Sequence, residues 1–175
     1  MNTFKYIDGS LHCEGVNLSA LEEKHGTPSY VYSKKTIEEN AKAYVNSFTN
    51  TRNLACFAVK SLSNLSILKI IKDAGCGFDI VSGGELHRVL SIGAEPKKII
   101  FSGVGKTKNE IQQGINSGIL SFNVESESEL YRIEKIAEGI GSPASISIRI
   151  NPDIDSGGHD YITTGRKGDK FGISD

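Results

Sequence analysis

The chain has 175 residues, enough for one ordinary domain, and its 38% hydrophobic and 23% charged residues are typical of a soluble globular protein. The formal net charge is −1 and the basic residues are scattered among acids, which excludes electrostatic attraction to nucleic acid or an anionic membrane. No apolar run approaches the roughly 20 residues that a membrane-spanning helix needs, and the N-terminus lacks a secretion-signal pattern. We therefore expect a cytoplasmic protein whose partners are small molecules or other subunits.

The first 33 residues differ in pattern from the rest of the chain. Residues Phe4–Val16 alternate loosely around Asp8-Gly9, which predicts a β-hairpin. Residues Leu18–His25 predict a short helix, and Ser29–Tyr32 predict another strand. We therefore predict that residues 1–33 form an N-terminal β segment outside the α/β region.

From residue 34 onward, helices and short apolar strands alternate. A first helix is marked by apolar positions at helical spacing, which are Ile37, Ala41, Tyr44, Val45 and Phe48. Five β-branched or aromatic runs follow, each too short for a helix: Leu54–Lys60, Gly77–Val81, Lys97–Phe101, Ile119–Val124 and Ala144–Ile150. Such runs favour parallel strands buried on both faces.

The helices between these strands are marked at both ends. Two hydroxyl-to-carboxylate spacings are those of capping boxes, namely Thr107 with Glu110 and Ser126 with Glu129. Glycines predict the helix C-termini, at or near Gly75, Gly93, Gly118 and Gly139. The Gly83-Gly84 pair similarly predicts a tight strand-to-helix turn rather than a phosphate site, because the acidic Glu85 follows it.

These units predict that residues 34–175 form the first part of a (β/α)8 barrel. A closed barrel usually needs about 250 residues, so five strands are expected to leave it open. An open, doubly wound α/β sheet is the alternative, since periodicity alone does not separate the two. With its sheet edges unpaired, the chain by itself is expected to be poorly soluble and inactive.

Polar residues follow each predicted strand, at the end where α/β proteins collect their functional groups. They are Lys60, Asp79, Ser82, Ser102, Gly103, Asn123, Glu125, Arg149 and Asn151. Lys60 closes a buried strand, where partial desolvation would favour a neutral amine able to form a Schiff base. The alternative is a lysine that only extends from the strand end into solvent.

Several segments in order resemble the diaminopimelate decarboxylase family. They are Phe57–Lys60, Ser63–Leu65, Gly77–Leu86, Phe101–Thr107, Phe122–Ser126, Arg149–Asp153, His159–Gly165 and Lys170–Gly172. The resemblance covers essentially the whole chain. One departure is Leu62, at a position where many family members have asparagine.

The resemblance implies a barrel of the alanine racemase and decarboxylase type that binds pyridoxal 5'-phosphate. It also implies a C-terminal β domain joined by the N-terminal segment, a homodimer, and conversion of meso-diaminopimelate to L-lysine and carbon dioxide. Lys60 matches the family's Schiff-base lysine, whereas Asp79 and Arg149 match positions near the cofactor. Glu85 matches a supporting position, and His159 opens a family loop without an assigned role. The family's phosphate loop and substrate arginines are expected beyond residue 175.

Other functions remain open from the residues themselves. Arginine and ornithine decarboxylases and alanine racemase are alternatives within the same class, and an inactive truncated chain or a cofactor-free Schiff-base aldolase are alternatives outside it. A nucleotide-binding loop at Gly103–Thr107 is disfavoured, because Ile100 stands where that motif needs glycine. The three cysteines, Cys13, Cys56 and Cys76, have no metal-like spacing, so we expect core thiols and no metal site.

Overall fold

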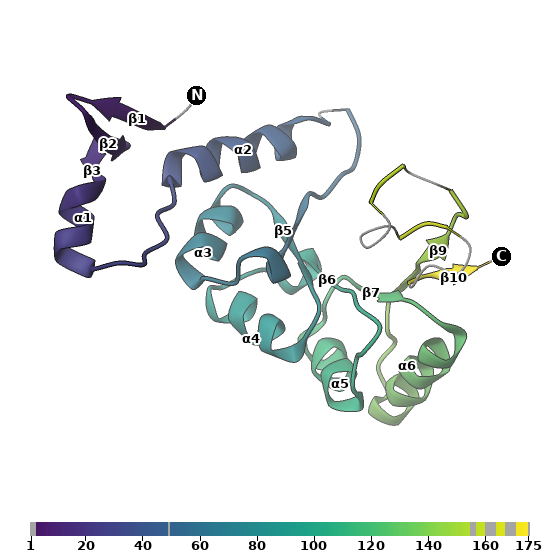
Figure 1. Cartoon of the computed structure of the whole chain (residues 1–175). Helices are drawn as coiled ribbons and strands as arrows, with labels where there is room; N and C mark the ends of the chain where they lie inside the picture. Colours follow the sequence, from purple (N-terminus) through teal and green to yellow (C-terminus); the bar gives the residue numbers. More distant parts are fainter. Residues whose placement is uncertain (1–2, 49, 155–156, 160–163, 167–170, 175) are drawn as a thin grey trace.

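A computed structural model describes residues 3–48, 50–154, 157–159, 164–166 and 171–174. It consists of an N-terminal arm, residues 3–33, and a partial α/β barrel that contains a five-stranded parallel sheet (Figure 1). Within the described part of the chain, none of the helices has the length and apolar character needed to cross a membrane. The Asp160–Thr163 and Lys170 parts of the family motifs lie outside the described residues.

The arm contains a three-stranded antiparallel sheet and one helix. Its elements are β1 (Phe4–Ile7), β2 (Ser10–Cys13), β3 (Val16–Asn17) and α1 (Leu18–His25). Asp8 and Gly9 both have positive φ angles, 48° and 76°, as a tight hairpin turn requires, so the predicted hairpin is confirmed. The strand predicted at Ser29–Tyr32 is wrong: this segment has no regular structure, and Tyr30 is 89% exposed. Its β-branched and aromatic residues lack a partner strand to pair with.

The arm is fastened to the N-terminus of α2 (Lys34–Asn46) by a carboxylate. Glu14 Oε1 accepts hydrogen bonds from Ser33 Oγ at 2.6 Å and from the Lys35 backbone N at 2.8 Å. The Thr3 and Thr36 hydroxyl oxygens lie 2.8 Å apart. Glu14 therefore satisfies free backbone and hydroxyl donors at a helix start, where negative charge is favoured. Helix α2 itself is shorter than predicted, since Phe48 lies beyond its end.

The parallel sheet contains strands in the order in which they occur along the chain. They are β4 (Cys56–Ala58), β5 (Gly77–Ile80), β6 (Ile99–Phe101), β7 (Ser121–Val124) and β8 (Ile146–Ile148). The connecting helices are α3 (Leu65–Asp73), α4 (Gly83–Ser91), α5 (Lys108–Ser117) and α6 (Glu127–Ile140). Short 3-10 turns, Val59–Ser61 and Pro96–Lys98, follow β4 and precede β6. All five predicted strands are confirmed, although each is shorter than its apolar run.

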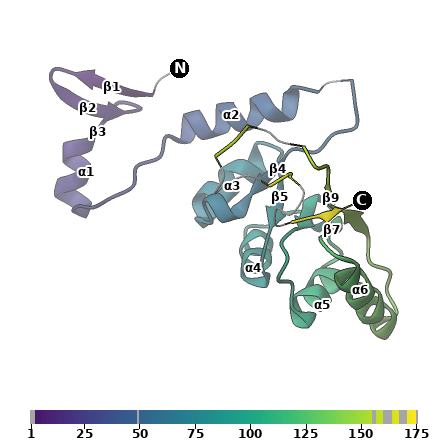
Figure 2. The same ribbon diagram turned by 45° about the vertical axis from the view of Figure 1, so that its right-hand side comes forward.

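The strand order favours the barrel over the open sheet. Neighbouring helices contact one another in chain order, from α2 through α6, and they lie on one face of the sheet in both views (Figures 1 and 2). A doubly wound sheet would reverse its strand order and carry helices on both faces. Sequential parallel strands with helices on one face are the arrangement of a barrel segment.

Aromatic side chains fill the layer between the sheet and its helices. Phe78, Phe101 and Phe122 are each at most 1% exposed. Phe101 and Phe122 face each other across β6 and β7 with ring centroids 5.9 Å apart. Burying a phenylalanine side chain contributes about 1.5–3 kcal/mol, so these three rings supply a substantial share of the core energy.

The opposite, inner face of the sheet is polar and partly open, which contradicts the prediction of strands buried on both faces. Along β5, Phe78 and Ile80 are buried against the helices while Asp79 between them is half-buried on the inner face. Ser121 and Asn123 alternate with buried residues in the same way on β7. The inner face is uncovered because these five strands do not close into a ring.

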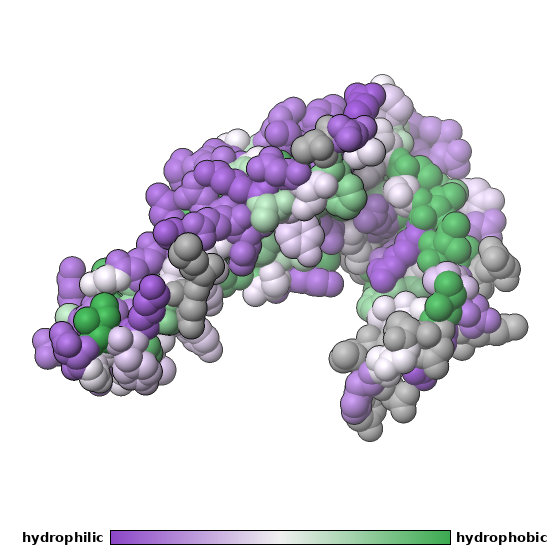
Figure 3. Space-filling view, turned by 90° about the horizontal axis from the view of Figure 1, so that it is seen from above, coloured by the Kyte–Doolittle hydropathy of each residue, from purple (hydrophilic) through white to green (hydrophobic). Residues whose placement is uncertain are grey.

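Strand β8 is the most exposed strand of the five-stranded sheet. Ile146 and Ile148 of β8 are 38% and 51% exposed, and the run predicted as one strand breaks at Arg149. A second strand, β9 (Ile150–Asn151), follows and pairs in parallel with β10 (Ile173–Ser174). Hydrophobic residues gather on this side of the molecule, at the right of Figure 3, whereas the arm at the left is mainly hydrophilic.

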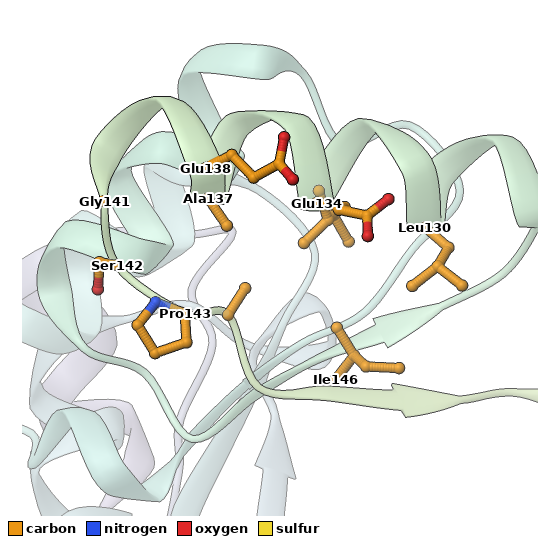
Figure 4. A pocket seen from close by; sticks show the side chains of 10 residues that line it. Leu130, Glu134, Ala137, Glu138, Gly141, Ser142, Pro143 and Ile146 are labelled. Carbon is orange, nitrogen blue, oxygen red and sulfur yellow. The ribbon is translucent and has the colours of Figure 1, made fainter.

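An apolar groove of about 470 Å³ lies between α6 and β8 (Figure 4). Leu130, Ala137 and Ile146 line it, and the carboxylates of Glu134 and Glu138 flank it on the helix. This groove contains no amine, guanidinium or paired polar group that could hold a reactive ligand. It is therefore a packing surface left beside the last strand and not the candidate site.

The helix ends agree with the sequence in part. Thr107 and Glu110 form a complete capping box, and Gly118 ends α5 in the left-handed conformation, as predicted. Helix α6 continues past Gly139 and ends at Gly141, whose φ is 71°. Ser126 caps α6, but the Glu129 carboxylate does not return to the Ser126 N–H, so the second predicted capping box is only half formed.

Gly114→Ala and Gly139→Ala are a matched pair of helical substitutions with opposite expected effects. A methyl group at Gly114 would lie 2.6 Å from Phe122 Cζ, whereas one at Gly139 would meet open space. Overpacking should lower the unfolding free energy of Gly114→Ala by about 1–3 kcal/mol. Gly139→Ala should raise it by about 1 kcal/mol or less, because alanine favours helix more than glycine. Denaturant unfolding in the full-length context measures both, and equal effects would contradict the packing described for α5.

Candidate functional site

The carboxyl ends of the strands open into one polar cavity of about 760 Å³. Its lining includes a residue from the end of every strand of the five-stranded sheet, together with the loop after β6 and the segment before β10. The lining residues are Lys60, Asp79, Val81, Ser102, Gly103, Val104, Gly105, Asn123, Glu125, Ser147, Arg149, Thr164 and Phe171. The cavity therefore brings together most of the polar strand-end residues that the sequence singled out.

Lys60 reaches this cavity from the 3-10 turn Val59–Ser61 that follows β4. The turn keeps Val59 fully buried and directs the chain out of the sheet, so Lys60 is exposed. The predicted partial desolvation of the Lys60 amine is therefore wrong, because no neighbouring element of the described structure covers it. Leu62, the residue that departs from the family pattern, packs against the hydrophobic core and stays out of the cavity lining.

Three polar side chains form a hydrogen-bonded row across β5, β6 and β7. Ser102 Oγ donates to Asp79 Oδ1 at 2.5 Å, and Asn123 Nδ2 donates to Ser102 Oγ at 2.9 Å. Because the serine hydroxyl has both a donor and an acceptor partner, the Asp79 carboxylate has a defined orientation. Asp79 thus has one carboxylate oxygen in a fixed hydrogen bond and lines the cavity.

A second polar cluster lies at the end of β7 and β8. Arg149 Nη1 donates to Glu125 Oε1 at 3.0 Å, and the Gly172 N–H donates to Glu125 Oε2 at 3.1 Å. The guanidinium carbon of Arg149 also lies 5.0 Å from the centre of the Phe171 ring. The Glu125 side chain is only 3% exposed and the Arg149 side chain 42% exposed, so a buried carboxylate anchors a partly exposed cation that lines the cavity.

Glu85 acts on the backbone next to the cavity. Its Oε2 accepts a hydrogen bond from the Val81 N–H at 2.7 Å, and its own N–H donates to Ser82 Oγ. Glu85 does not line the cavity itself, but Val81 does. The carboxylate therefore fixes the strand-to-helix turn between β5 and α4, which is the turn predicted at Gly83-Gly84.

Besides Glu85, three residues from the sequence analysis are absent from the described lining of the cavity. Ser82 is the N-cap of α4, and Asn151 is buried with its amide donating to the Arg166 carbonyl oxygen at 3.0 Å. His159 is exposed on the segment after β9 and is not among the described residues that line the cavity.

Sequence reasoning missed a buried ion pair directly behind the cavity. The Lys106 ammonium lies 2.9 Å from Glu129 Oε1, and the two side chains are 0% and 6% exposed. Lys106 appeared in the sequence only as part of a rejected nucleotide-binding motif, and Glu129 only as a helix cap. The pairing joins residues 23 positions apart, so no local pattern signals it.

The cysteines offer no nucleophile at this site. Burial, followed by the charge of Asp79 and the proximity of Cys76, raises the pKa of Cys56 to about 11. Cys13 and Cys76 are buried free thiols, and burial raises the pKa of both. The expectation of core thiols is confirmed for Cys13 and Cys76, whereas Cys56 is half-buried, and Lys60 remains the exposed nucleophilic candidate in the cavity.

The family is established by comparison with known proteins. The family model described as "Pyridoxal-dependent decarboxylase, pyridoxal binding domain" matches residues 34–175. The chain therefore belongs to the pyridoxal-dependent decarboxylases, and membership implies pyridoxal phosphate as the cofactor.

The chain is similar to several diaminopimelate decarboxylases. The enzyme of that name from Pseudomonas aeruginosa is 48% identical over 174 residues, covering 99% of this chain but 42% of the relative. The structure of diaminopimelate decarboxylase from M. jannaschii in co-complex with L-lysine has a TM-score of 0.88 at 37% identity, covering 99% of this chain and 41% of that one. The corresponding structure from Helicobacter pylori, complexed with L-lysine, has a TM-score of 0.87 at 46% identity, covering 90% and 40%.

The chain thus spans about two fifths of the length of the relatives it matches. Within that share, its cavity fits pyridoxal phosphate. An exposed amine can bond the cofactor's aldehyde carbon, and an oriented carboxylate and a guanidinium supply an acceptor and a cation for its polar groups. The cavity volume of about 760 Å³ lies within the range of small-molecule sites.

Glu110→Gln should make the unfolding free energy of the protein less dependent on pH in the acid range. Burial raises the pKa of Glu110, but hydrogen bonds from the Gly83 N–H and from the Thr107 N–H and hydroxyl lower it further, so its pKa is below the usual value. A lowered folded-state pKa contributes stability above the unfolded value of about 4.3 and loses it as the pH falls through the folded value. At pH 7 the variant should be about 1 kcal/mol less stable.

Unfolding free energies measured from pH 6 to pH 3 test this expectation. Glu110→Gln should show a shallower loss of stability over the acid range than the parent protein. Glu138→Gln, at an exposed position near the end of α6, is the matched control and should keep the parent's slope. Identical slopes for Glu110→Gln and the parent would show that this carboxylate does not link α4 to α5.

Proposed function

We propose that the protein containing this chain decarboxylates meso-2,6-diaminopimelate to L-lysine and carbon dioxide with pyridoxal phosphate. The observation that carries the proposal is a single cavity lined by the exposed Lys60, by Asp79 and by Arg149. Sequence identity of about 48% to diaminopimelate decarboxylases, over nearly the whole chain, supports this substrate over those of the arginine and ornithine decarboxylases. Two similar structures contain L-lysine, the product of the proposed reaction.

In this proposal Lys60 is the residue that carries the cofactor. Its amine lies at the end of a short turn anchored by the fully buried Val59, so the nucleophile has a defined starting point and free access to a ligand. When bound, pyridoxal phosphate supplies the electron sink for the electron pair left by loss of carbon dioxide.

The other residues of the site present charged groups to the cofactor or hold those groups in position. Asp79, kept in place by the Ser102 hydroxyl, presents a carboxylate acceptor to the cofactor. Arg149, anchored by Glu125 and stacked on Phe171, presents a cation to an anionic group of the cofactor. Glu85 has a supporting role through the Val81 turn, and we assign none to His159.

The proposal extends to the organisation of the whole protein. Residues 1–33 would form a β segment that joins a C-terminal β domain, and residues 34–175 the first part of the cofactor-binding barrel. The arm's separate three-stranded sheet supports this division. A cytoplasmic homodimer completes the proposal, on the family resemblance, and residues 1–175 alone would be inactive.

Lys60→Ala should abolish decarboxylation in the full-length context while leaving the fold intact, because the exposed side chain contributes little packing. Carbon dioxide release and circular dichroism should be measured on the same preparation. Lys69→Ala, an exposed lysine on α3, is the matched control and should retain activity. Activity of Lys60→Ala within tenfold of the parent would remove Lys60 from the mechanism.

Asp79→Ala should weaken cofactor affinity or turnover without unfolding the protein, because Asp79 is half-buried on the inner face and outside the aromatic core. The cofactor dissociation constant and the melting temperature separate the two roles. Asp79→Asn keeps an acceptor for Ser102 and should melt like the parent. A much lower melting temperature with unchanged turnover would instead identify Asp79 as a structural residue.

A further inference from the structure

Lys106 is a buried lysine whose three ammonium protons all have acceptors. Its Nζ lies 2.7 Å from the Gly103 carbonyl oxygen, 2.7 Å from the Asn123 carbonyl oxygen and 2.9 Å from Glu129 Oε1. The side chain is 0% exposed and is absent from the described cavity lining. Lys106 is therefore saturated with partners and is unsuited to bind a ligand itself.

The partners of this ion pair belong to the wall of the candidate site. Gly103 and Asn123 both line the cavity, one in the loop after β6 and the other at the end of β7. The second oxygen of Glu129, Oε2, accepts a hydrogen bond from the backbone N–H of Glu125 at 2.8 Å. The pair thus holds the backbone of three cavity-lining residues from behind.

Those backbone positions determine where the functional side chains point. Asn123 donates to Ser102, which donates to Asp79, so the position of Asn123 is transmitted to the Asp79 carboxylate. Glu125 receives the guanidinium of Arg149, so the position of Glu125 is transmitted to that cation. The buried Lys106–Glu129 pair therefore supports both hydrogen-bonded clusters of the site, one through Asn123 and the other through Glu125.

We propose that Lys106 and Glu129 are positioning residues that set the cofactor affinity of this site by fixing Gly103, Asn123 and Glu125. The inference rests on the proposed function for its ligand, but its structural part concerns the chain alone. A buried ion pair contributes little net stability compared with a well-packed apolar pair. An apolar side chain at position 106, however, would leave the carbonyl oxygens of Gly103 and Asn123 without their donor.

Two variants separate positioning from stability. Lys106→Met leaves Glu129 as an unpaired buried carboxylate and should lower the melting temperature. Lys106→Met combined with Glu129→Gln removes that charge while the glutamine oxygen keeps an acceptor for the Glu125 N–H, so most of the melting temperature should return. Lys98→Met, at the opposite end of β6 in an exposed pair with Glu95, is the matched control.

Two measurements are made on the full-length protein. Titration of pyridoxal phosphate into the cofactor-free protein gives its dissociation constant, and amide hydrogen exchange without cofactor reports on residues 103–105 and 123–125. The double variant should bind pyridoxal phosphate at least tenfold more weakly than the parent, and its two segments should exchange at least tenfold faster, despite its recovered melting temperature. Lys98→Met should match the parent in both.

The outcomes distinguish the inference from the proposed function. A double variant with the parent's melting temperature, affinity and exchange rates would overturn the positioning role. A parent protein that does not bind pyridoxal phosphate would refute the proposed function, while the exchange rates would still decide whether the pair fixes the cavity wall. If both Lys106 variants fail to fold, Glu129→Gln alone decides: a threefold or larger loss of affinity supports the role, and an unchanged affinity overturns it.

Discussion

The first four strands of the five-stranded sheet, β4 to β7, are each followed by a helix on the same face, and this one-sided arrangement determines where each type of side chain can go. Since side chains alternate along a strand, one half of them is buried against the helices and the other half faces inward. Phe78, Phe101 and Phe122 belong to the first half and form the core, whereas Asp79 and Asn123 belong to the second. Parallel strands also end at the same edge, so the inward polar groups meet beside the turns that carry Lys60 and Arg149.

The polar groups of the site differ in how firmly they are held. Glu125, Lys106 and Glu129 are buried and bonded to the backbone as well as to one another. Asp79 and Arg149 line the cavity, and each is held there by one side-chain hydrogen bond. Their remaining acceptor and donor atoms can bind a ligand. Lys60 is exposed. This gradient, from a saturated interior to an available surface, is what a ligand site requires, because the groups that meet a ligand need support without being consumed by it.

The surfaces beside the terminal strands have a different character. The apolar residues of β8 and the groove below α6 are exposed, and the arm meets the barrel segment through the Glu14 contacts at the start of α2. These apolar surfaces lie beside β8, at one edge of the five-stranded sheet.

The strands, most helix ends and the position of Lys60 follow from local sequence, because β-branched runs, N-caps and terminal glycines act over a few residues. The family motifs, which are also local, singled out Asp79 and Arg149, and both residues line the cavity. The errors have tertiary causes. Ser29–Tyr32 has strand propensity but pairs with no strand of the described residues, and Gly139 lies within a helix whose end is set by the left-handed Gly141. Lys60 is exposed because no described element covers its turn. The Lys106–Glu129 pair joins residues that the fold alone makes adjacent, since a long-range ion pair depends on the packing of two neighbouring βα units and leaves no periodic signal in the sequence.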